Sequence, residues 1–246
     1  MIRQGRVSES VKTFDFLGKF NLNRYNDINK PCIFFGCYVY RNDHKIILNR
    51  NSLAVLVWRG SDITSVPKEI MKSNKSRKNI KHVAIGSFIK KDLEKLNIKY
   101  KYFPITSTII NPDPQPLGKY IYTYAPNKFY NKAFIDELSQ TFKIYNNERN
   151  MTKEQEYEAL LNSFIGLRLT PHDGLPNTVI KLGLMGRKCI YNGILPNAIS
   201  YKNKEEVINI IKKESKAIGQ TNISLAYSMA NFLHDDLIWL NEKIWT

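Results

Sequence analysis

Short apolar runs alternate with helical patterns along the chain, and this alternation is typical of parallel βαβ architecture. Runs rich in aromatic and β-branched residues predict buried strands, because such side chains pack well on a pleated surface. We expect strands at 32–40, 52–60, 82–88, 98–105, 119–125, 142–146, 164–170 and 187–193. Apolar residues at helical spacing predict helices at 66–73, 89–96, 130–142, 153–164 and 204–214. The pattern therefore predicts an α/β protein.

The segment NPDPQPLG, residues 111–118, interrupts this alternation. Its three prolines deny the chain the hydrogen bonds of both a helix and a sheet ladder. We therefore expect a domain boundary there, which gives a first lobe at 1–116 and a second lobe at 117–222.

Residues 223–246 are the last predicted element. Apolar side chains recur there at helical spacing and predict one long amphipathic helix that packs back on the first lobe. These side chains are Leu225, Met229, Phe232, Leu233, Leu237 and Leu240. A helix bound to a membrane surface would need a more basic polar face than HDDLIWLNE provides.

The chain is strongly basic, with a formal net charge of +15. Between Lys68 and Lys101 there are eleven lysines and arginines and only three acidic residues. Two interpretations stay open. The segment is a solvated lysine-rich face, or it attracts a polyanion such as nucleic acid, an anionic membrane surface or an acidic glycan.

Other features narrow the class of protein. No apolar run approaches the roughly 18 residues of a membrane span, and the start, MIRQGRVSESVKTFDFLGKF, lacks the apolar block of a signal peptide. We expect a cytoplasmic protein of a bacterial or virus-infected cell. Cys32, Cys37 and Cys189 lack the paired spacing of thiolate metal sites, so we expect them to be buried. No GxGxxG motif follows the first strand, which argues against a Rossmann oxidoreductase.

The segment from Phe164 to Gly193 carries the clearest candidate chemistry. It reads as a strand, a turn, a helix that starts near Pro176 or Asn177, and a second strand. Gly174 lets the backbone come close to a ligand, and Pro176 suits the start of a helix. The amino end of a helix carries partial positive charge and unpaired N–H groups, so this junction can hold a diphosphate without a metal.

The letters DGLPNTVIKLGLMGRKCI resemble the donor-binding signature of retaining GT-B glycosyltransferases of the group 1/4 type. That signature reads Glu-Gly-Leu-Pro, with a second Glu eight residues after the first. The resemblance implies two Rossmann-like lobes with parallel sheets, a C-terminal crossover helix, a nucleotide-sugar co-substrate such as a UDP-sugar, and no metal or other cofactor.

Carried over residue by residue, the resemblance places Asp173 opposite the sugar hydroxyls and gives His172 a contact to donor phosphate or sugar. It places Gly174, Leu175, Asn177 and Thr178 in the phosphate-facing turn. Lys181 stands in place of the second acid. Arg168, and either Lys128 or Lys132, are the bases expected near the diphosphate. The alternatives are that Asp173 caps the following helix and that Arg168 is a structural ion-pair partner.

Two first-lobe segments extend the resemblance. LVWRGSD, residues 56–62, resembles a strand and loop that often reads Val-His-Gly-Gly-Asp, with Arg59 in the position of the catalytic His. Residues 86–105 resemble the segment in which a Ser precedes a helix and a last strand. Gly36, Asp62 and Ser87 are the candidate residues on the acceptor side, whereas Asp43 and His44 are expected in a polar loop without a catalytic role.

The function implied by this resemblance is transfer of a sugar to an acceptor hydroxyl. The favoured acceptor is a hydroxylated base in DNA, as in phage-type DNA glycosyltransferases, because the basic segment belongs to the acceptor lobe and Trp58 and Tyr100 could stack on an extruded base. The alternatives are a cell-surface or lipid-linked glycan as acceptor, and a non-catalytic basic module that binds nucleic acid or glycan on a transferase scaffold.

Overall fold

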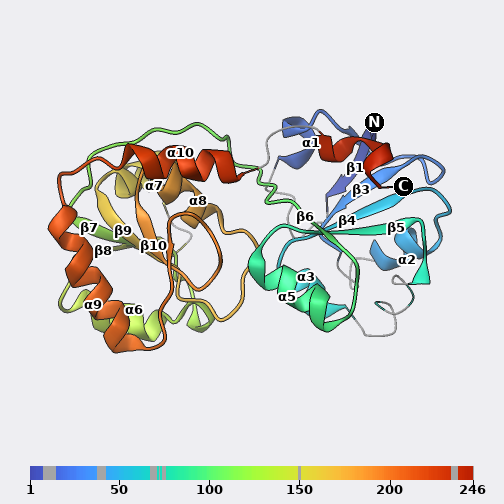
Figure 1. Cartoon of the computed structure of the whole chain (residues 1–246). Helices are drawn as coiled ribbons and strands as arrows, with labels where there is room; N and C mark the ends of the chain where they lie inside the picture. Colours follow the sequence, from blue (N-terminus) through green and yellow to red (C-terminus); the bar gives the residue numbers. More distant parts are fainter. Residues whose placement is uncertain are drawn as a thin grey trace. The chain divides into compact units, whose positions relative to one another are not determined.

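The computed structural model describes residues 1–7, 15–37, 43–66, 71, 73, 76–148, 151–233 and 238–245. Contacts divide the chain into two compact units, and Figure 1 colours the chain along its sequence. Unit 1 comprises Met1–Ser107, Asp173–Leu175 and His234–Thr246. Unit 2 comprises Thr108–His172 and Pro176–Leu233. Most of the helix expected at 66–73 lies outside the described residues.

Unit 1 is built on a sheet of six described strands in the order β2-β1-β3-β4-β5-β6, and every described strand pair is parallel. The strands are β1 (Gln4–Val7), β2 (Asn23–Arg24), β3 (Cys32–Phe35), β4 (Ala54–Trp58), β5 (Ile80–Ala84) and β6 (Lys101–Tyr102). The helices are α1 (Phe16–Lys19), α2 (Asp43–Leu48), α3 (Ser61–Ser65) and α5 (Ser87–Lys95).

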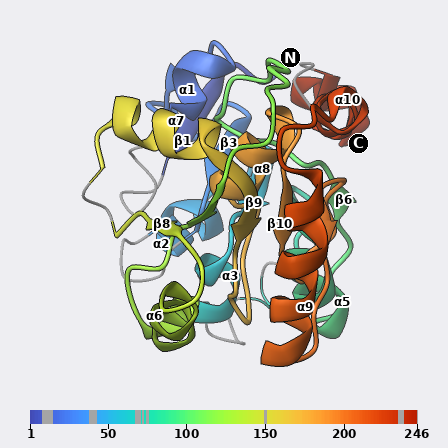
Figure 2. The ribbon, with the colours of Figure 1, turned by 90° about the vertical axis from the view of Figure 1, so that its left-hand side faces the viewer.

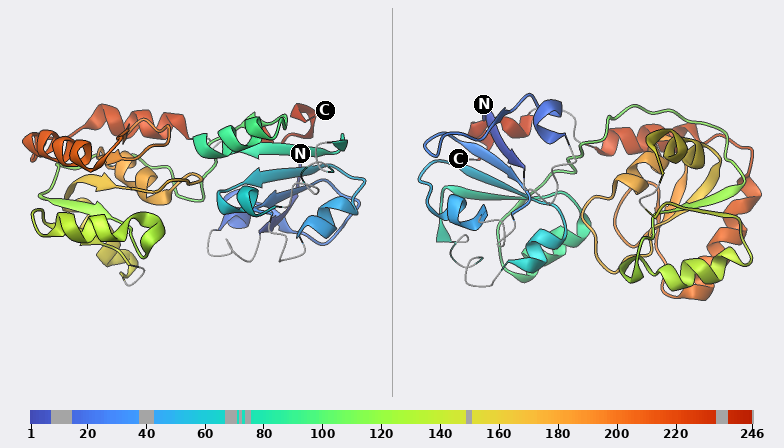
Figure 3. Two further views of the ribbon diagram at one scale, coloured as in Figure 1. Left: turned by 90° about the horizontal axis from the view of Figure 1, so that it is seen from below. Right: turned by 180° about the vertical axis from the view of Figure 1, so that it is seen from behind.

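The two faces of this sheet are covered by different elements, as Figures 1 and 3 show. Alternate residues of each strand point to opposite faces. On one face, Phe34 and Leu56 belong to a core that also contains Ile89 of α5. On the other face, Phe35 stacks on Phe16 of α1 and meets the edge of Trp239, which lies in η5 (Ile238–Leu240). A second short 3₁₀ helix, η6 (Glu242–Ile244), follows.

Unit 2 has five described strands in the order β11-β10-β9-β7-β8, again with every described pair parallel. The strands are β7 (Tyr120–Thr123), β8 (Ile144–Asn146), β9 (Ser163–Leu167), β10 (Lys188–Ile190) and β11 (Ala198–Ile199). The helical elements are η3 (Lys128–Tyr130), α6 (Lys132–Ser139), α7 (Lys153–Leu161), α8 (Asn177–Leu184), α9 (Lys204–Glu214), η4 (Ser215–Ala217) and α10 (Ile223–Phe232). Figure 2 shows α6 and α9 on one side of the sheet and α7, α8 and α10 on the other.

The proline-rich segment 111–118 is packed along unit 2. The backbone N–H of Asp113 donates to the carbonyl of Leu184 at 2.9 Å, and that of Leu117 donates to the carbonyl of Gln220 at 2.8 Å. The guanidinium of Arg187, which is fully buried, donates to four backbone carbonyls. These belong to Pro116, Leu161, Ser163 and Met185. The contacts divide the chain between Ser107 and Thr108, ahead of the prolines.

The expectation of one helix from 223 to 245 is wrong. Helix α10 ends at Phe232, and the described residues after it form the short elements η5 and η6. Met229 of α10 packs against Gly183 of α8 so closely that a Cβ at Gly183 would lie 2.4 Å from Cε of Met229. Helix α10 therefore belongs to unit 2, and residues from 234 onward belong to unit 1.

The structure also tests what we expected of Asp43 and His44, of the three cysteines and of membrane-spanning helices. Asp43 and His44 lie at the start of α2 and not in a loop, and the Asp43 carboxylate accepts from Arg6 Nε at 2.9 Å. The three cysteines are free and buried, as predicted. None of the described helices is long and apolar enough to cross a membrane.

Candidate functional site

Helix α8 follows the carboxyl end of β9 and begins without a side-chain cap. Pro176 is its N-cap residue and makes no capping hydrogen bond, and the first turn contains no acidic residue. Helices α7, α9 and α10 of the same unit are capped by Thr152, Asn203 and Asn222, whereas α6, like α8, has no side-chain cap. Because the first backbone N–H groups of a helix have no partner within its own ladder, the amino end of α8 presents a positive dipole end to an outside acceptor.

Small residues explain why the chain forms this strand, turn and helix. A Cβ at Gly166 of β9 would lie 2.1 Å from Leu182 of α8, so the glycine allows the helix to pack directly on the sheet. At the other end of α8, Gly186 adopts a φ of 80°, which favours glycine. The N–H of Arg187 then donates to the carbonyl of Leu182 at 2.8 Å and closes the helix. The predicted strand-turn-helix-strand order is confirmed.

Two buried polar side chains, those of Arg168 and Thr170, follow β9 at this end of the sheet. Arg168 is 7% exposed, and its guanidinium carbon lies 4.6 Å from the ring centre of Tyr130 and 5.5 Å from that of Tyr124. Thr170 is 2% exposed, and its hydroxyl has no hydrogen-bond partner. A buried hydroxyl without a partner is unfavourable, so it marks a place where a ligand or water is needed. Only its place after the strand distinguishes Thr170 in the amino-acid sequence.

Lys181 is paired with an acid that the sequence did not single out. Its Nζ lies 2.6 Å from the carboxylate of Glu156, in the first turn of α7. The other carboxylate oxygen lies 3.3 Å from the hydroxyl of Tyr122, and that hydroxyl accepts from the side-chain amide of Asn147 at 3.2 Å. Burial raises the pKa of Tyr122. A carboxylate therefore lies beside the position where the resemblance expected one.

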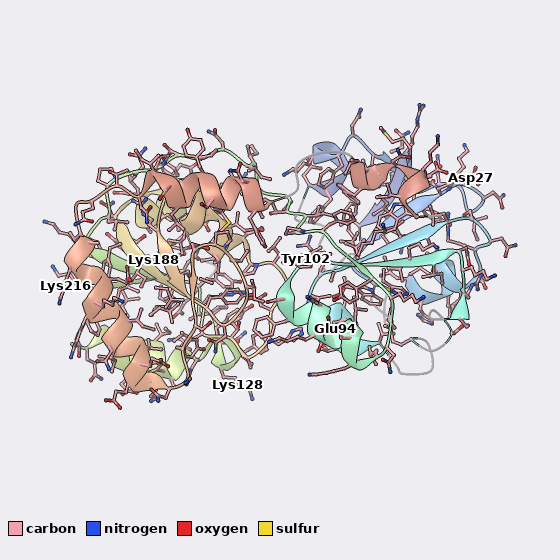
Figure 4. All side chains as sticks on the ribbon, in the orientation of Figure 1. Asp27, Glu94, Tyr102, Lys128, Lys188 and Lys216 are labelled. Carbon is pink, nitrogen blue, oxygen red and sulfur yellow. The ribbon has the colours of Figure 1, made fainter. Side chains whose placement is uncertain are left out.

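The two candidate bases near η3 differ in their partners. Lys132 lies 2.8 Å from Asp136 and 3.1 Å from Glu148, and the hydrogen bond to Asp136 is the main cause of its raised pKa. Lys128 is exposed and has no acidic partner among the described residues. Figure 4 labels Lys128 at the periphery of unit 2. Of the two lysines, Lys128 is the one whose charge is not compensated.

In unit 1, the loop after β4 is closed by a buried carboxylate. Asp62 is fully buried and accepts from the backbone N–H groups of Cys37, Arg59, Gly60 and Ile63 at 3.3, 2.9, 2.8 and 3.1 Å. Burial raises the pKa of Asp62, while the hydrogen bonds from the backbone oppose that change. Both carboxylate oxygens accept from backbone N–H groups, so the side chain holds the loop in shape.

The other unit 1 candidates lie at the carboxyl ends of its strands. Gly36 follows β3 with a φ of 79°, and Ser87 is buried at the start of α5. The guanidinium of Arg59 lies 4.2 Å from the ring centre of Phe16. Open parallel sheets bind ligands at this edge, so these positions are where a site is expected.

Residues 173–175 belong to unit 1 by their contacts. The backbone N–H of Gly174 donates to the Asp173 carboxylate at 2.9 Å. A Cβ at Gly174 would lie 1.7 Å from the carbonyl oxygen of Arg59, and a Cβ at Gly86 would lie 2.1 Å from the carbonyl oxygen of Gly174. Glycine is therefore required at both positions. His172 is half-buried and belongs to unit 2.

Solved structures resemble this chain over most of its length. The crystal structure of TarM aligns with a TM-score of 0.58 and 12% identity, covering 89% of this chain and 55% of that one. A mutant of S. aureus TarM in complex with Fondaparinux, alpha-GlcNAc-glycerol and UDP aligns with a TM-score of 0.53 and 12% identity, covering 89% and 54%. The chain has the GT-B fold. No protein-family model matches the chain, and no curated protein matches it in sequence.

The GT-B fold agrees with the predicted fold class, with two parallel sheets and helices on both faces of each. The chain spans 55% and 54% of the two TarM chains. Within the described ranges, no three His, Cys, Asp or Glu side chains lie together in a way that could hold a metal ion.

Proposed function

We propose that this chain is a glycosyltransferase that moves a sugar from a nucleotide-sugar donor to an acceptor hydroxyl. The amino end of α8 carries the proposal, because it follows the carboxyl end of a parallel strand and its N-cap residue, Pro176, makes no side-chain cap. The partnerless hydroxyl of Thr170 is a second sign of a ligand there. The TarM complex with UDP shows that a protein of similar fold binds a nucleoside diphosphate.

In unit 2, the first-turn amides of Asn177 and Thr178 are suited to bind the diphosphate. When the bond between the anomeric carbon and the diphosphate oxygen breaks, negative charge develops on the leaving group. Arg168 and Lys128 supply positive charge for it, with His172 as a further donor. The pairing of Lys132 with Asp136 and Glu148 favours Lys128 as the base of that pair. We propose that the Glu156 carboxylate, which lies 2.6 Å from Lys181 Nζ, accepts hydrogen bonds from the ribose hydroxyls.

We assign the sugar hydroxyls to Asp173, with Gly174 and Leu175 in the same turn, and a catalytic role near the acceptor to Arg59. The expected reaction retains the anomeric configuration. Asp173→Ala should lower turnover by at least about 100-fold, the usual scale for losing a group that acts in the transition state. The matched control is Asp136→Ala, an exposed acid of α6. Unchanged turnover and donor affinity in Asp173→Ala would show that the assignment is wrong.

The acceptor is proposed separately. A hydroxylated base in DNA fits the basic composition, but Trp58 cannot stack on it, since that side chain is fully buried and its indole N–H donates to His82 Nδ1 at 3.0 Å. A saccharide or polyol hydroxyl is the second candidate, because the TarM complex contains alpha-GlcNAc-glycerol. Sugar incorporation into hydroxymethylated DNA and into a glycan panel, measured side by side, distinguishes the two acceptors.

A thermal-shift panel of nucleoside diphosphates and nucleotide sugars tests the donor. A ligand that binds the folded state at 100 times its Kd stabilises it by about 2.7 kcal/mol, so UDP or a UDP-sugar should raise the Tm by several degrees. Hydrolysis of the same nucleotide sugars, with and without acceptors, tests the non-catalytic alternative. Donor binding without turnover on any acceptor would favour a binding module on a transferase scaffold.

A further inference from the structure

Unit 1 contains a large pocket at the amino ends of its strands. It has a volume of about 1110 Å³ and is lined by residues that precede or begin β4, β5 and β6, together with η6. In parallel sheets the amino ends lie opposite the carboxyl ends, which carry the loops with Gly36, Arg59 and Ser87. The pocket is therefore distinct from the candidate transferase residues of unit 1. Its volume lies at the upper end of the range of small-ligand pockets, roughly 300–1,000 Å³, so the pocket has room for a ligand of nucleotide size or larger.

The charge of the pocket is almost entirely positive. Its single acid, Glu242, lies 3.5 Å from the ammonium group of Met1 and is partly neutralised by it. Arg77 is occupied with the backbone carbonyls of Leu48 and Arg50. The remaining lining cations have no acidic partner among the described residues, and they are Lys78, Lys81, Lys99 and Lys101. Such a wall complements an anion with several charges.

The pocket also presents a buried donor without a partner. His82, which lines it, is 4% exposed, and burial lowers the pKa of His82 to about 4. Its Nδ1 accepts from the indole N–H of Trp58, a group that can only donate, so the neutral ring carries its proton on Nε2. Within the part of the chain that the structure describes, that Nε2–H has no hydrogen-bond partner. A ligand atom that accepts a hydrogen bond would satisfy it.

The remaining wall is apolar and aromatic. Leu53, Ile80, Ile98 and Ile244 line the pocket beside the half-buried ring of Tyr100, whose hydroxyl donates to Glu94, labelled in Figure 4. Sugar hydroxyls need acceptors as well as donors, and the wall has few side-chain acceptors: Glu242 is paired with Met1, Asn79 Oδ1 accepts from Arg77, and Asn97 adds one amide oxygen. Nucleotides combine a flat base, acceptor atoms and a phosphate charge, which matches an apolar wall, a lone donor and several lysines.

We propose that this pocket binds single-stranded nucleic acid, with phosphates against Lys78, Lys81, Lys99 and Lys101 and a base against Tyr100. Binding there requires no nucleotide sugar, so the proposal stands apart from the transferase function. The site does not require a chemical step. It holds a strand whose sequence is not read, since lysines and an aromatic ring recognise phosphates and base faces of any sequence.

The test is fluorescence anisotropy of the full chain with a labelled oligothymidylate of about 12 nucleotides, a length within the known range for single-strand sites. Lys78→Gln with Lys99→Gln should weaken binding at least about tenfold at low salt and reduce the log–log salt slope by about 1.4, or about 0.7 for each lost phosphate contact. The control pair, Lys212→Gln with Lys213→Gln on the exposed side of α9, removes the same charge and should change affinity less than about twofold.

Two further measurements test the contacts of the bound strand with Tyr100 and with His82. Tyr100→Leu should weaken binding several-fold while Tyr100→Phe, which keeps the ring, should not, and the His82 Nε2–H resonance should shift when the oligonucleotide binds. Equal losses in the two lysine pairs would mean diffuse attraction and would overturn the pocket. Stronger competition by a heparin oligosaccharide than by DNA, with the same dependence on Lys78 and Lys99, would replace nucleic acid by an anionic glycan.

Discussion

The loop after β4 in unit 1 and the loop before α8 in unit 2 follow parallel strands at equivalent edges, yet their backbone amides have different partners. Asp62 supplies a buried carboxylate that accepts from four backbone N–H groups of unit 1. The carboxylate of the first loop accepts from four backbone amides, whereas in the second loop Asp173 accepts from the amide of Gly174 and the N-cap residue of α8, Pro176, makes no side-chain cap. This difference supports the proposal that the amino end of α8 binds the donor diphosphate.

Removing the internal anion should have the largest effect. Asp62→Ala leaves the backbone amides of Cys37, Arg59 and Gly60 without this acceptor, and we expect it to lower the free energy of unfolding by about 3 kcal/mol. Urea denaturation followed by circular dichroism measures the loss. Asp136→Ala, which removes an exposed acid, is the control and should lie within about 0.5 kcal/mol of the wild type. A loss below about 1 kcal/mol for Asp62→Ala would mean that the Asp62 carboxylate does not stabilise its loop, and the contrast between the two loops would be wrong.

Adding a carboxylate at the start of α8 should weaken the binding of a diphosphate there. Asn177→Asp places a carboxylate at the first helical position, where it stabilises the helix by about 0.5 kcal/mol and repels a diphosphate. We expect the affinity for UDP to fall about tenfold, measured by isothermal titration calorimetry. Asn203→Asp at the N-cap of α9 makes the same charge change at a helix that is already capped, and it should leave UDP affinity unchanged. Equal affinities for both variants would contradict a diphosphate site at α8.

The smallest effect concerns the two lysines near η3. Lys128→Gln should raise the KM for the nucleotide sugar about threefold to fivefold, since it removes an uncompensated charge near the diphosphate. Lys132→Gln should leave KM unchanged and slightly lower the Tm, because this lysine is paired with Asp136 and Glu148. The reverse pattern would show that Lys132 leaves its ion pairs to bind the donor.

Local structure was predictable from the sequence, and contacts between distant segments were not. The turn and helix at 171–184 follow from Gly, Pro and apolar spacing within one stretch of chain. In contrast, the partner of Lys181 lies in α7, and the rings beside Arg168 come from the segment after β7. These contacts depend on how helices pack on the sheet, which periodicity does not encode.

Strand β1 was missed for a related reason. It reads QGRV and lacks an apolar run, yet it pairs with β3. Gln4 is 4% exposed because its side chain donates to the carbonyls of Asp27 and Lys30. A polar residue is stable inside a sheet when its hydrogen bonds are satisfied by a loop, and only the folded chain shows that loop. The prediction of one long C-terminal helix was wrong for the opposite reason: apolar residues continue at helical spacing beyond Phe232, although the helix ends there.

We expect Arg187 to make the edge of unit 2 open as one cooperative unit. Burial lowers its pKa to about 10, so the side chain remains a cation at neutral pH, and its hydrogen bonds join the proline-rich segment to the ends of α7 and α8 and to the start of β9. If only one of these segments detached, the buried Arg187 cation would lose hydrogen bonds without becoming fully hydrated, which is unfavourable. The amide hydrogens of these segments should therefore exchange with deuterium together rather than one after another. A stretch with the composition of a linker thus becomes one of the last places for solvent or a protease to enter.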